Sequence, residues 1–464
     1  MKTTIALFAL MLILGCSLQS QIIHVPQDHA TIQGAIDATV DHDTVLVAPG
    51  EYFENINFHG RNIVVCSNFA TSNDPSDVIS TIINGSTPVH ADTGSCVLIV
   101  SGEDSTTVLQ GFTITGGTGT RWEDEHNLNH WYTEGGGILI QYSSPTIKDN
   151  IISWNVAINA SAGITSAGGG AIRSGDSNPH ILNNIISNNK GRYGGGIVMN
   201  FSGAQIKNNL IIGNSGGEDF GGGGLWLLAN GDKPLILENN TVVNNSSALG
   251  GGGIRLWSCD ALVLNNIFWG NTASYSPQIQ GFSGTVNYCC IEEGFNGEGN
   301  IEGNPEFVPG SFILTDNSPC IDAGNPDVSY NDPEDPSNPG LALYPAKGSL
   351  HADMGVYGGP GCSPLPDVIT GIDMHSEDPL GILVNIFPNP ASSTITIEAG
   401  TDHENTLEIQ ICDSNSVIKR LDIIHLDNNG QHKVMTDISE LSPGTYFITI
   451  RTENGVQVHK FIKI

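Results

Sequence analysis

A phrase repeated between Gly135 and Asn271 constrains this chain more than any other feature. Each of five copies begins with a run of glycines, continues through an aliphatic stretch and a turn, and ends with two asparagines five positions apart. The asparagine pairs are Asn150/Asn155, Asn184/Asn189, Asn209/Asn214, Asn240/Asn245 and Asn266/Asn271. Self-similarity at a period of roughly 20–50 residues predicts a solenoid, in which each repeat forms a coil that packs on its neighbours.

Within a copy the side chains alternate as they do in β-strands. In the first copy, Ile138 and Ile140 are expected to point inward, and Leu139 and Gln141 outward. Each coil then holds three short strands, which pair in parallel with the next coil at about 4.8 Å. Glycine and asparagine suit the turns because they tolerate positive φ, and asparagines stacked at one corner can hydrogen-bond along the stack. We therefore assign the asparagines to the scaffold and not to catalysis.

The stretch before the repeats begins IIHVPQDHATIQGAIDATVDHDTVLVAPGEYFE at Ile22–Glu54. This stretch, the repeats and the later words NSPCIDAGNP (Asn317–Pro326) and DMGVYG (Asp353–Gly358) resemble the right-handed parallel β-helix superfamily of pectin-lyase-like proteins. The resemblance covers roughly Gln21 to Cys362 and implies an all-β solenoid with an N-terminal capping helix at about Thr31–Ala38. It implies little about activity, because this fold hosts unrelated chemistries.

The two ends of the chain carry export signals. Residues 1–20 have a basic start at Lys2 and an apolar run from Ile5 to Leu14, which predicts a secretory signal cleaved after Ser20. The alternative is a lipoprotein box ending at Cys16. Residues 363–380 bear proline and aspartate without strand alternation, so they are predicted to be a linker after the β-helix of residues 21–362.

Residues 381–464 alternate like about seven strands of a small β-sandwich. The words IFPNPASSTITIE (Ile386–Glu398), LSPGTYFITI (Leu441–Ile450) and HKFIKI at the C-terminus resemble the type A C-terminal sorting domain of the type IX secretion system. The resemblance implies that the type IX secretion machinery is a partner, that the domain is removed, and that the protein is released or held at the outer cell surface. A carbohydrate-binding or fibronectin-like sandwich is the alternative.

The charge balance of the chain limits the classes of partner that it can bind. Lys and Arg total 17 against 48 Asp and Glu, which gives a formal charge of -31 and leaves no basic footprint for nucleic acid. After the signal, no segment is apolar enough to span a bilayer. The acid excess predicts solubility outside the cell, with calcium binding along Asp327–Asp335 as the alternative. No cofactor is expected otherwise, and no metal site is assigned.

Cysteines cluster late in the predicted solenoid, at Cys289, Cys290, Cys320 and Cys362. An exported protein permits disulfides, so these residues could staple the end of the solenoid. The pairing itself does not follow from the sequence.

The residues that break the repeat are the candidates for binding. Aligned on their first inward aliphatic residue, the copies place one set of side chains in a single outward column: Leu139, Arg173, Val198, Trp226 and Arg255. The next outward column contains Gln141, Gly175, Asn200, Leu228 and Trp257. Aromatic faces stack on sugar rings and arginine binds carboxylates, so Arg173, Trp226, Arg255 and Trp257 are predicted to bind polysaccharide. Packing of the two tryptophans under a loop is the alternative.

The insertion Thr118–Glu134 (TGTRWEDEHNLNHWYTE) lengthens one coil and adds Trp122 and Trp131 as candidate sugar contacts. Its His126 and His130 would share a face on a helical turn and could then bind metal, although a sugar-binding lip or a solvated loop is favoured over metal.

No catalytic set is recognisable, and the catalytic residues are unknown. A lyase base, a glycosidase carboxylate pair and a G-x-S-x-G elbow are all absent as motifs. The sequence therefore predicts an exported β-helix protein that binds polysaccharide. A divergent polysaccharide lyase or hydrolase and a structural surface fibre or adhesin are the alternatives.

Overall fold

The computed structural model describes residues 20–366, except 125, 159–164, 218–219, 230–232, 282–283 and 309–310, and strands between residues 382 and 463. Nearly all of the predicted signal segment and most of the predicted linker lie outside the described residues.

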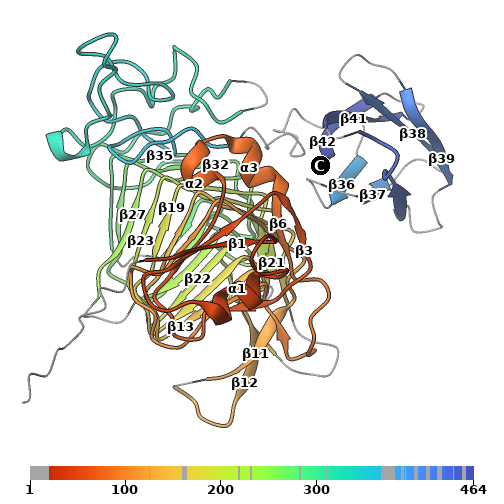
Figure 1. The fold of residues 1–464 in the computed structure, drawn as a ribbon. Coiled ribbons are helices and arrows are strands. Elements are labelled where there is room, and N and C mark those ends of the chain that lie inside the picture. Colours follow the sequence, from red (N-terminus) through yellow and green to blue (C-terminus); the bar gives the residue numbers. More distant parts are fainter. Residues whose placement is uncertain are drawn as a thin grey trace, which may run out of the picture.

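Three long parallel sheets form the walls of a solenoid, as predicted (Figure 1). Sheet A contains β1 (Ile22–Val25), β2 (Thr44–Val47), β5 (Val64–Ser67), β9 (Val108–Gln110), β14 (Thr146–Lys148), β19 (His180–Leu182), β23 (Ala204–Lys207), β27 (Leu235–Glu238), β31 (Leu262–Leu264) and β34 (Thr285–Asn287). Sheet B contains β3 (Gly50–Tyr52), β6 (Thr81–Asn84), β10 (Thr113–Thr115), β15 (Ile151–Ser153), β20 (Ile185–Ser187), β24 (Leu210–Ile212), β28 (Thr241–Val243), β32 (Ile267–Trp269) and β35 (Cys290–Ile291). Sheet C contains β4 (Ile56–Asn57), β8 (Val97–Ile99), β13 (Ile138–Gln141), β18 (Ile172–Gly175), β22 (Ile197–Asn200), β26 (Leu225–Leu228), β30 (Ile254–Leu256) and β33 (Ile279–Gln280).

Two smaller sheets extend the coils. One contains β16 (Val156–Ala157), β21 (Lys190–Gly191), β25 (Ser215–Gly216) and β29 (Ser246–Ser247). The other contains β7 (Thr93–Gly94), β11 (Gly119–Glu123), β12 (Trp131–Glu134) and β17 (Ser166–Gly168). Within it β11 and β12 pair antiparallel, so the insertion forms a hairpin that projects from the solenoid (Figure 1).

The interior of the solenoid is aliphatic. The first inward position of sheet C forms a fully buried column made of Ile138, Ile172, Ile197, Leu225 and Ile254. At the N-terminal end, α1 (Ile32–Ala38) lays Ile32, Ala35 and Ile36 over the core, where the capping helix was predicted. Thr31 caps this helix by accepting from the Gly34 amide, and the Glu54 carboxylate accepts from the amides of Ile32 and Gln33.

The asparagine pairs form two buried ladders. In each ladder every asparagine except the last donates from Nδ2 to the Oδ1 of the asparagine one coil further on, over 2.9 to 3.1 Å. The first ladder contains Asn150, Asn184, Asn209, Asn240 and Asn266; the second contains Asn155, Asn189, Asn214, Asn245 and Asn271. The left-handed backbone is adopted instead by the residue before each ladder asparagine, for example Asn183 and Asn208. In these turns one residue adopts the left-handed backbone, and the asparagine that follows it makes the ladder hydrogen bonds.

The glycine runs are needed for close stacking. A Cβ on Gly170 would lie 2.3 Å from the carbonyl oxygen of Gly195, and a Cβ on Gly223 would lie 2.4 Å from that of Gly252. Because backbone meets backbone at these corners, a side chain cannot be accommodated.

A second apolar layer covers the outer face of sheet B. The short helices α2 (Phe69–Ser72) and α3 (Pro75–Ser80) cover its N-terminal part, and residues 292–366, here called the closing segment, return over its C-terminal part (Figure 1). In the closing segment, the 3-10 helix η1 spans Val328–Tyr330. Val356, Tyr357 and Leu365 pack on outward residues of sheet B such as Leu210 and Ile212. Asn208 and Asn239 also donate to backbone carbonyls of the closing segment, which fixes its path.

The described part of residues 382–463 forms seven strands in two antiparallel sheets, which agrees with the predicted sandwich. One sheet contains β36 (Ile382–Phe387), β37 (Thr394–Thr401) and β40 (Gln431–Asp437); the other contains β38 (Thr406–Asp413), β39 (Ile418–His425), β41 (Gly444–Arg451) and β42 (Val456–Lys463). Among all described residues, no helix combines the length and apolar character needed to cross a bilayer.

Candidate binding site at the end of the asparagine ladder

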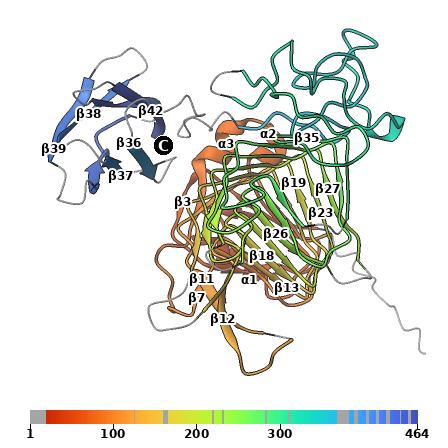
Figure 2. The ribbon, with the colours of Figure 1, turned by 180° about the vertical axis from the view of Figure 1, so that it is seen from behind.

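The predicted outward column of sheet C has the predicted register but not the predicted exposure. Leu139, Arg173, Val198, Trp226 and Arg255 pair in succession from coil to coil, and β18 and β26 of this face are visible in Figure 2. Arg173, Trp226 and Arg255 are nevertheless only 3%, 8% and 8% exposed. These three side chains therefore do not form an exposed outward surface, because other side chains cover them.

Arg173 is covered where the hairpin joins the solenoid. Its guanidinium lies 3.4 Å from Glu134 Oε1, and Gln141 Nε2 donates to Glu134 Oε2 over 3.1 Å. All three side chains are buried. A charge pair of this kind anchors the end of β12 against sheet C, and removal of one partner would leave the other charge buried.

Trp226 and Arg255 lie beneath an aromatic stack. Tyr193 packs edge-on against Trp226, with ring centroids 5.4 Å apart, and stacks on Phe220 at 4.4 Å. Arg255 donates to the carbonyl oxygen of Phe220, and its guanidinium lies 4.8 Å from the ring centroid of Trp257. Trp257 is 50% exposed, so it is the member of the predicted tryptophan–arginine set that solvent reaches.

The hairpin places its two tryptophans apart from that stack. Trp131 is 44% exposed and lies 4.9 Å from the Arg121 guanidinium, whereas Trp122 is half-buried in register with Tyr132. The described residues of the hairpin contain no helix, so His126 and His130 do not share a helical face. His126 instead contacts the Asp176 carboxylate at 3.0 Å and the ring of Phe201 at 3.8 Å.

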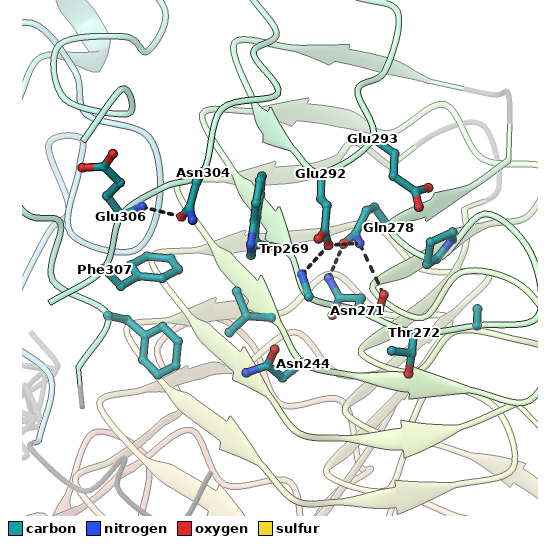
Figure 3. Close-up of a pocket in the computed structure, with 15 residues that line it drawn as sticks. Asn244, Trp269, Asn271, Thr272, Gln278, Glu292, Glu293, Asn304, Glu306 and Phe307 are labelled. Atoms are coloured by element: carbon teal, nitrogen blue, oxygen red, sulfur yellow. Dashed lines mark hydrogen bonds between the residues drawn. The ribbon is translucent and has the colours of Figure 1, made fainter. Parts of the chain in front are cut away.

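A hollow of about 690 Å³ lies where the second asparagine ladder ends, and we call it the Trp269 pocket (Figure 3). Asn271, the last asparagine, donates from Nδ2 to Gln278 Oε1 over 2.7 Å. Gln278 Nε2 and the Gly270 amide both donate to Glu292 Oε2, each over 2.7 Å. Gln278 and Glu292 thus take the place of the next ladder asparagine, and they form one side of the pocket.

Trp269 lies between this polar side and the part of the closing segment that carries Asn304 and Phe307 (Figure 3). Across the pocket, Phe307 and Phe312 pack edge-to-face with ring centroids 5.2 Å apart, and Asn304 Oδ1 accepts from the Glu306 amide. Glu293 and Thr272 complete the polar lining in Figure 3. A half-buried indole beside amide and carboxylate groups offers an apolar face and hydrogen-bonding partners in the same hollow.

The lining of the Trp269 pocket is acidic. It includes Glu292, Glu293 and Glu306, and none of its described lining residues is Lys, Arg or His. An anionic ligand would be repelled there, whereas a neutral ligand rich in hydroxyl groups finds both donors and acceptors. The dimensions fall within the usual range for a small-ligand site, which is about 300–1,000 Å³.

Sequence reasoning missed this pocket, although one signal for it was present. Trp269 occupies an outward column of sheet B whose earlier members are Ser153, Ser187, Ile212 and Val243, so a large aromatic ring breaks the series in the last full coil. The partners of Trp269 come from the irregular closing segment, which has no repeat from which to infer positions.

In the part of the chain that the structure describes, no group of three or more His, Cys, Asp or Glu side chains is placed to hold a metal ion. Along the acidic stretch Asp327–Asp335, the carboxylates of Asp327 and Asp335 accept hydrogen bonds from nearby backbone amides, including those of Ser329 and Ser337. These carboxylates therefore cap local turns.

Comparison with known proteins agrees with this architecture. Residues 95–273 match the family described as "Right handed beta helix region", and residues 385–464 match the one described as "Secretion system C-terminal sorting domain". The chain is a right-handed parallel β-helix protein that carries a type IX secretion system sorting domain. It is thus an exported protein.

No curated protein matches the chain. A solved structure of a pectin methylesterase mutant in complex with a hexasaccharide is 9% identical, with a TM-score of 0.34 over 65% of this chain and 98% of that one. A similarity of this size supports no transfer of activity.

Proposed function

We propose that this exported β-helix protein binds polysaccharide, and that the Trp269 pocket receives an uncharged segment of a sugar chain. The observation that carries the proposal is the position of Trp269 in a hollow of about 690 Å³, beside the hydrogen-bonded group formed by Gln278, Asn271 and Glu292. An indole face stacks on the C–H face of a sugar, and the neighbouring amides and carboxylates bind its hydroxyl groups.

Charge supports a neutral ligand over a polyuronate. Three glutamates line the pocket and the chain carries a formal charge of -31, so a carboxylated polymer would meet repulsion. The arginines that were predicted to bind uronates, Arg173 and Arg255, are buried in contacts with Glu134 and Phe220. The favoured ligand is therefore a neutral glycan.

A glycan panel tests the proposal. The full chain without its signal segment would be screened by affinity electrophoresis against neutral polysaccharides and polyuronates, together with Trp269→Ala and Trp257→Ala. We expect retardation by a neutral polymer that Trp269→Ala abolishes and Trp257→Ala preserves. If only Trp257→Ala abolished the retardation, the binding site would be the exposed part of the sheet C face. If no polymer retarded the wild-type protein, a structural fibre would be favoured.

The same incubations test the enzymatic alternative. If the wild-type protein shortened the polymer or produced unsaturated uronates, it would be a hydrolase or lyase and the binding proposal would be incomplete. Unchanged polymer length with retained retardation is the expected result.

We further propose that the sorted protein remains at the outer cell surface, where a polysaccharide ligand is accessible. Cell fractionation tests this: recovery in the outer-membrane fraction, accessible to added protease, supports it, whereas recovery in the medium alone contradicts it.

A further inference from the structure

Two adjacent cysteines at the start of β35, the last strand of sheet B, point to opposite sides of the solenoid wall. Cys289 takes the place of the next asparagine in the first ladder, and its Sγ accepts from the Asn266 amide at 3.4 Å. It belongs to the interior core, and burial raises the pKa of its thiol to about 12. Because neighbouring side chains of a strand alternate, Cys290 faces the closing segment instead.

On that outer side, Cys290 meets Cys320. Both side chains are fully buried, and both belong to one small apolar cluster with Ile267, Leu314 and Met354. Side-chain hydrogen bonding with Cys320 raises the pKa of the Cys290 thiol, and burial raises it further. Shared burial in this cluster places the two thiols near each other. The other described cysteine of the closing segment, Cys362, is half-buried and does not belong to this cluster.

We propose that Cys290 and Cys320 form a disulfide in the exported protein. The two Sγ atoms join as the thiols lose two protons and two electrons, and a protein or small-molecule disulfide in the oxidising compartment accepts the electrons and becomes two thiols. The hydrogen bond that Cys290 Sγ donates to the carbonyl oxygen of Gly303 is given up in this step. Because both cysteines are already packed in one buried cluster, the two sulfurs can join with little movement of the chain.

The bond would close residues 291–319 into a loop. That loop contributes Glu292 and Glu293 to one side of the Trp269 pocket and Asn304, Phe307 and Phe312 to the other. A disulfide restricts the unfolded chain and holds such a loop in place. Export of this protein thus couples oxidation to the shape of the Trp269 pocket, whether or not the pocket binds sugar.

Peptide mass spectrometry of the exported protein, alkylated before digestion and left unreduced, tests the proposal. We expect one cross-linked peptide pair joining the segment around Cys290 to the segment around Cys320, shifted by the mass of two hydrogens, and still present in Cys289→Ser. Alkylated Cys290 and Cys320 in the wild type, a bond to Cys289 or a bond to Cys362 would each overturn it.

Thermal stability provides a second test of the proposed disulfide. Reduction should lower the melting temperature of the wild type by about 5 °C, and it should have no such effect on the double variant Cys290→Ser/Cys320→Ser. Cys362→Ser is the matched control and should keep the full response to reduction. An equal response of the double variant would contradict the bond. If the double variant does not fold, the cross-linked peptide in the wild type still decides.

Discussion

Gln278 donates from Nε2 to Oε2 of Glu292 over 2.7 Å, and this bond continues the second asparagine ladder beyond its last asparagine. The same carboxylate oxygen accepts from the Gly270 amide. A structural ladder therefore ends as one side of a pocket, where its polar groups border solvent instead of another coil.

Replacement of Glu292 by Ala should weaken this end of the solenoid by about 1–3 kcal/mol, because the Gly270 amide loses its acceptor and Gln278 Nε2 keeps only its longer bond to the carbonyl oxygen of Asn271. Thermal unfolding would measure the change. Glu293→Gln is the matched control, since Glu293 is exposed beside it and should tolerate the substitution. Equal melting temperatures for the two variants would contradict the role assigned to Glu292.

Asn214→Ala should destabilise the protein more strongly, by about 3 kcal/mol or more. Asn214 is fully buried, and its Oδ1 accepts from both the backbone amide and Nδ2 of Asn189. Alanine would remove the acceptor of the Asn189 amide, one of the partners of Asn189 Nδ2, and the side-chain donor to the carbonyl oxygen of Ile186. Denaturant unfolding would measure the loss, with Asn127→Ala in the exposed hairpin as control. A loss no larger than that of the control would mean that the ladder contributes little.

The two tryptophans of the sheet C face, Trp226 and Trp257, should differ in how much they contribute to stability. Trp226→Ala removes a buried ring that packs against Tyr193, and we expect a loss of about 3 kcal/mol in stability with glycan retardation retained. Trp257→Ala removes a half-exposed ring and should change stability by much less. Melting temperatures of the two variants would measure this difference. If the Trp226→Ala protein were stable but no longer bound glycan, the result would support the predicted role of Trp226 in binding polysaccharide.

Stability of the closing segment should fall as pH rises. Burial, aided by the charge of Asp353, raises the pKa of Asp332 to about 8, and burial raises the pKa of Asp353 to about 7. Because both values lie above the ordinary value of about 3.9, the folded state binds these protons more tightly than the unfolded state. Their contribution is complete below about pH 4 and is lost as pH rises through about 7 to 8.

Melting temperatures at several pH values between 5 and 9 would check this pH dependence. Asp332→Asn should show a weaker decline than the wild type. Asp327→Asn is the control, because Asp327 is exposed and its pKa is lowered by hydrogen bonds from Ser329, so it stays ionised in this range. A decline as steep in Asp332→Asn as in the wild type would contradict the assignment.

The periodic parts of this protein follow from its sequence, and the site does not. Fixed spacing between Asn150 and Asn155 and their counterparts was enough to predict the coils, the register and the ladders, since each repeat has the same geometry. The same alignment placed Trp226 beside Arg255 correctly. Exposure of those side chains could not be predicted, because Tyr193 and Phe220, which cover them, lie in irregular turns.

The Trp269 pocket shows the same limit. Trp269 itself is visible in the sequence as a large residue in a column of smaller ones, but Phe307 and Phe312 reach it only through the path of the closing segment. That path depends on contacts over more than a hundred residues, such as the bond from Asn208 to the carbonyl oxygen of Gly358. A repeat pattern contains no information about it.

The dissociation constant of Trp269→Ala for the best neutral glycan, compared with that of the wild type by isothermal titration calorimetry, tests the central claim most directly. Loss of an aromatic anchor should cost about 2 kcal/mol, which weakens binding roughly 30-fold, while the melting temperature stays near that of the wild type because the ring is only partly buried. An unchanged dissociation constant in a folded Trp269→Ala protein would contradict the assignment of this pocket as the binding site.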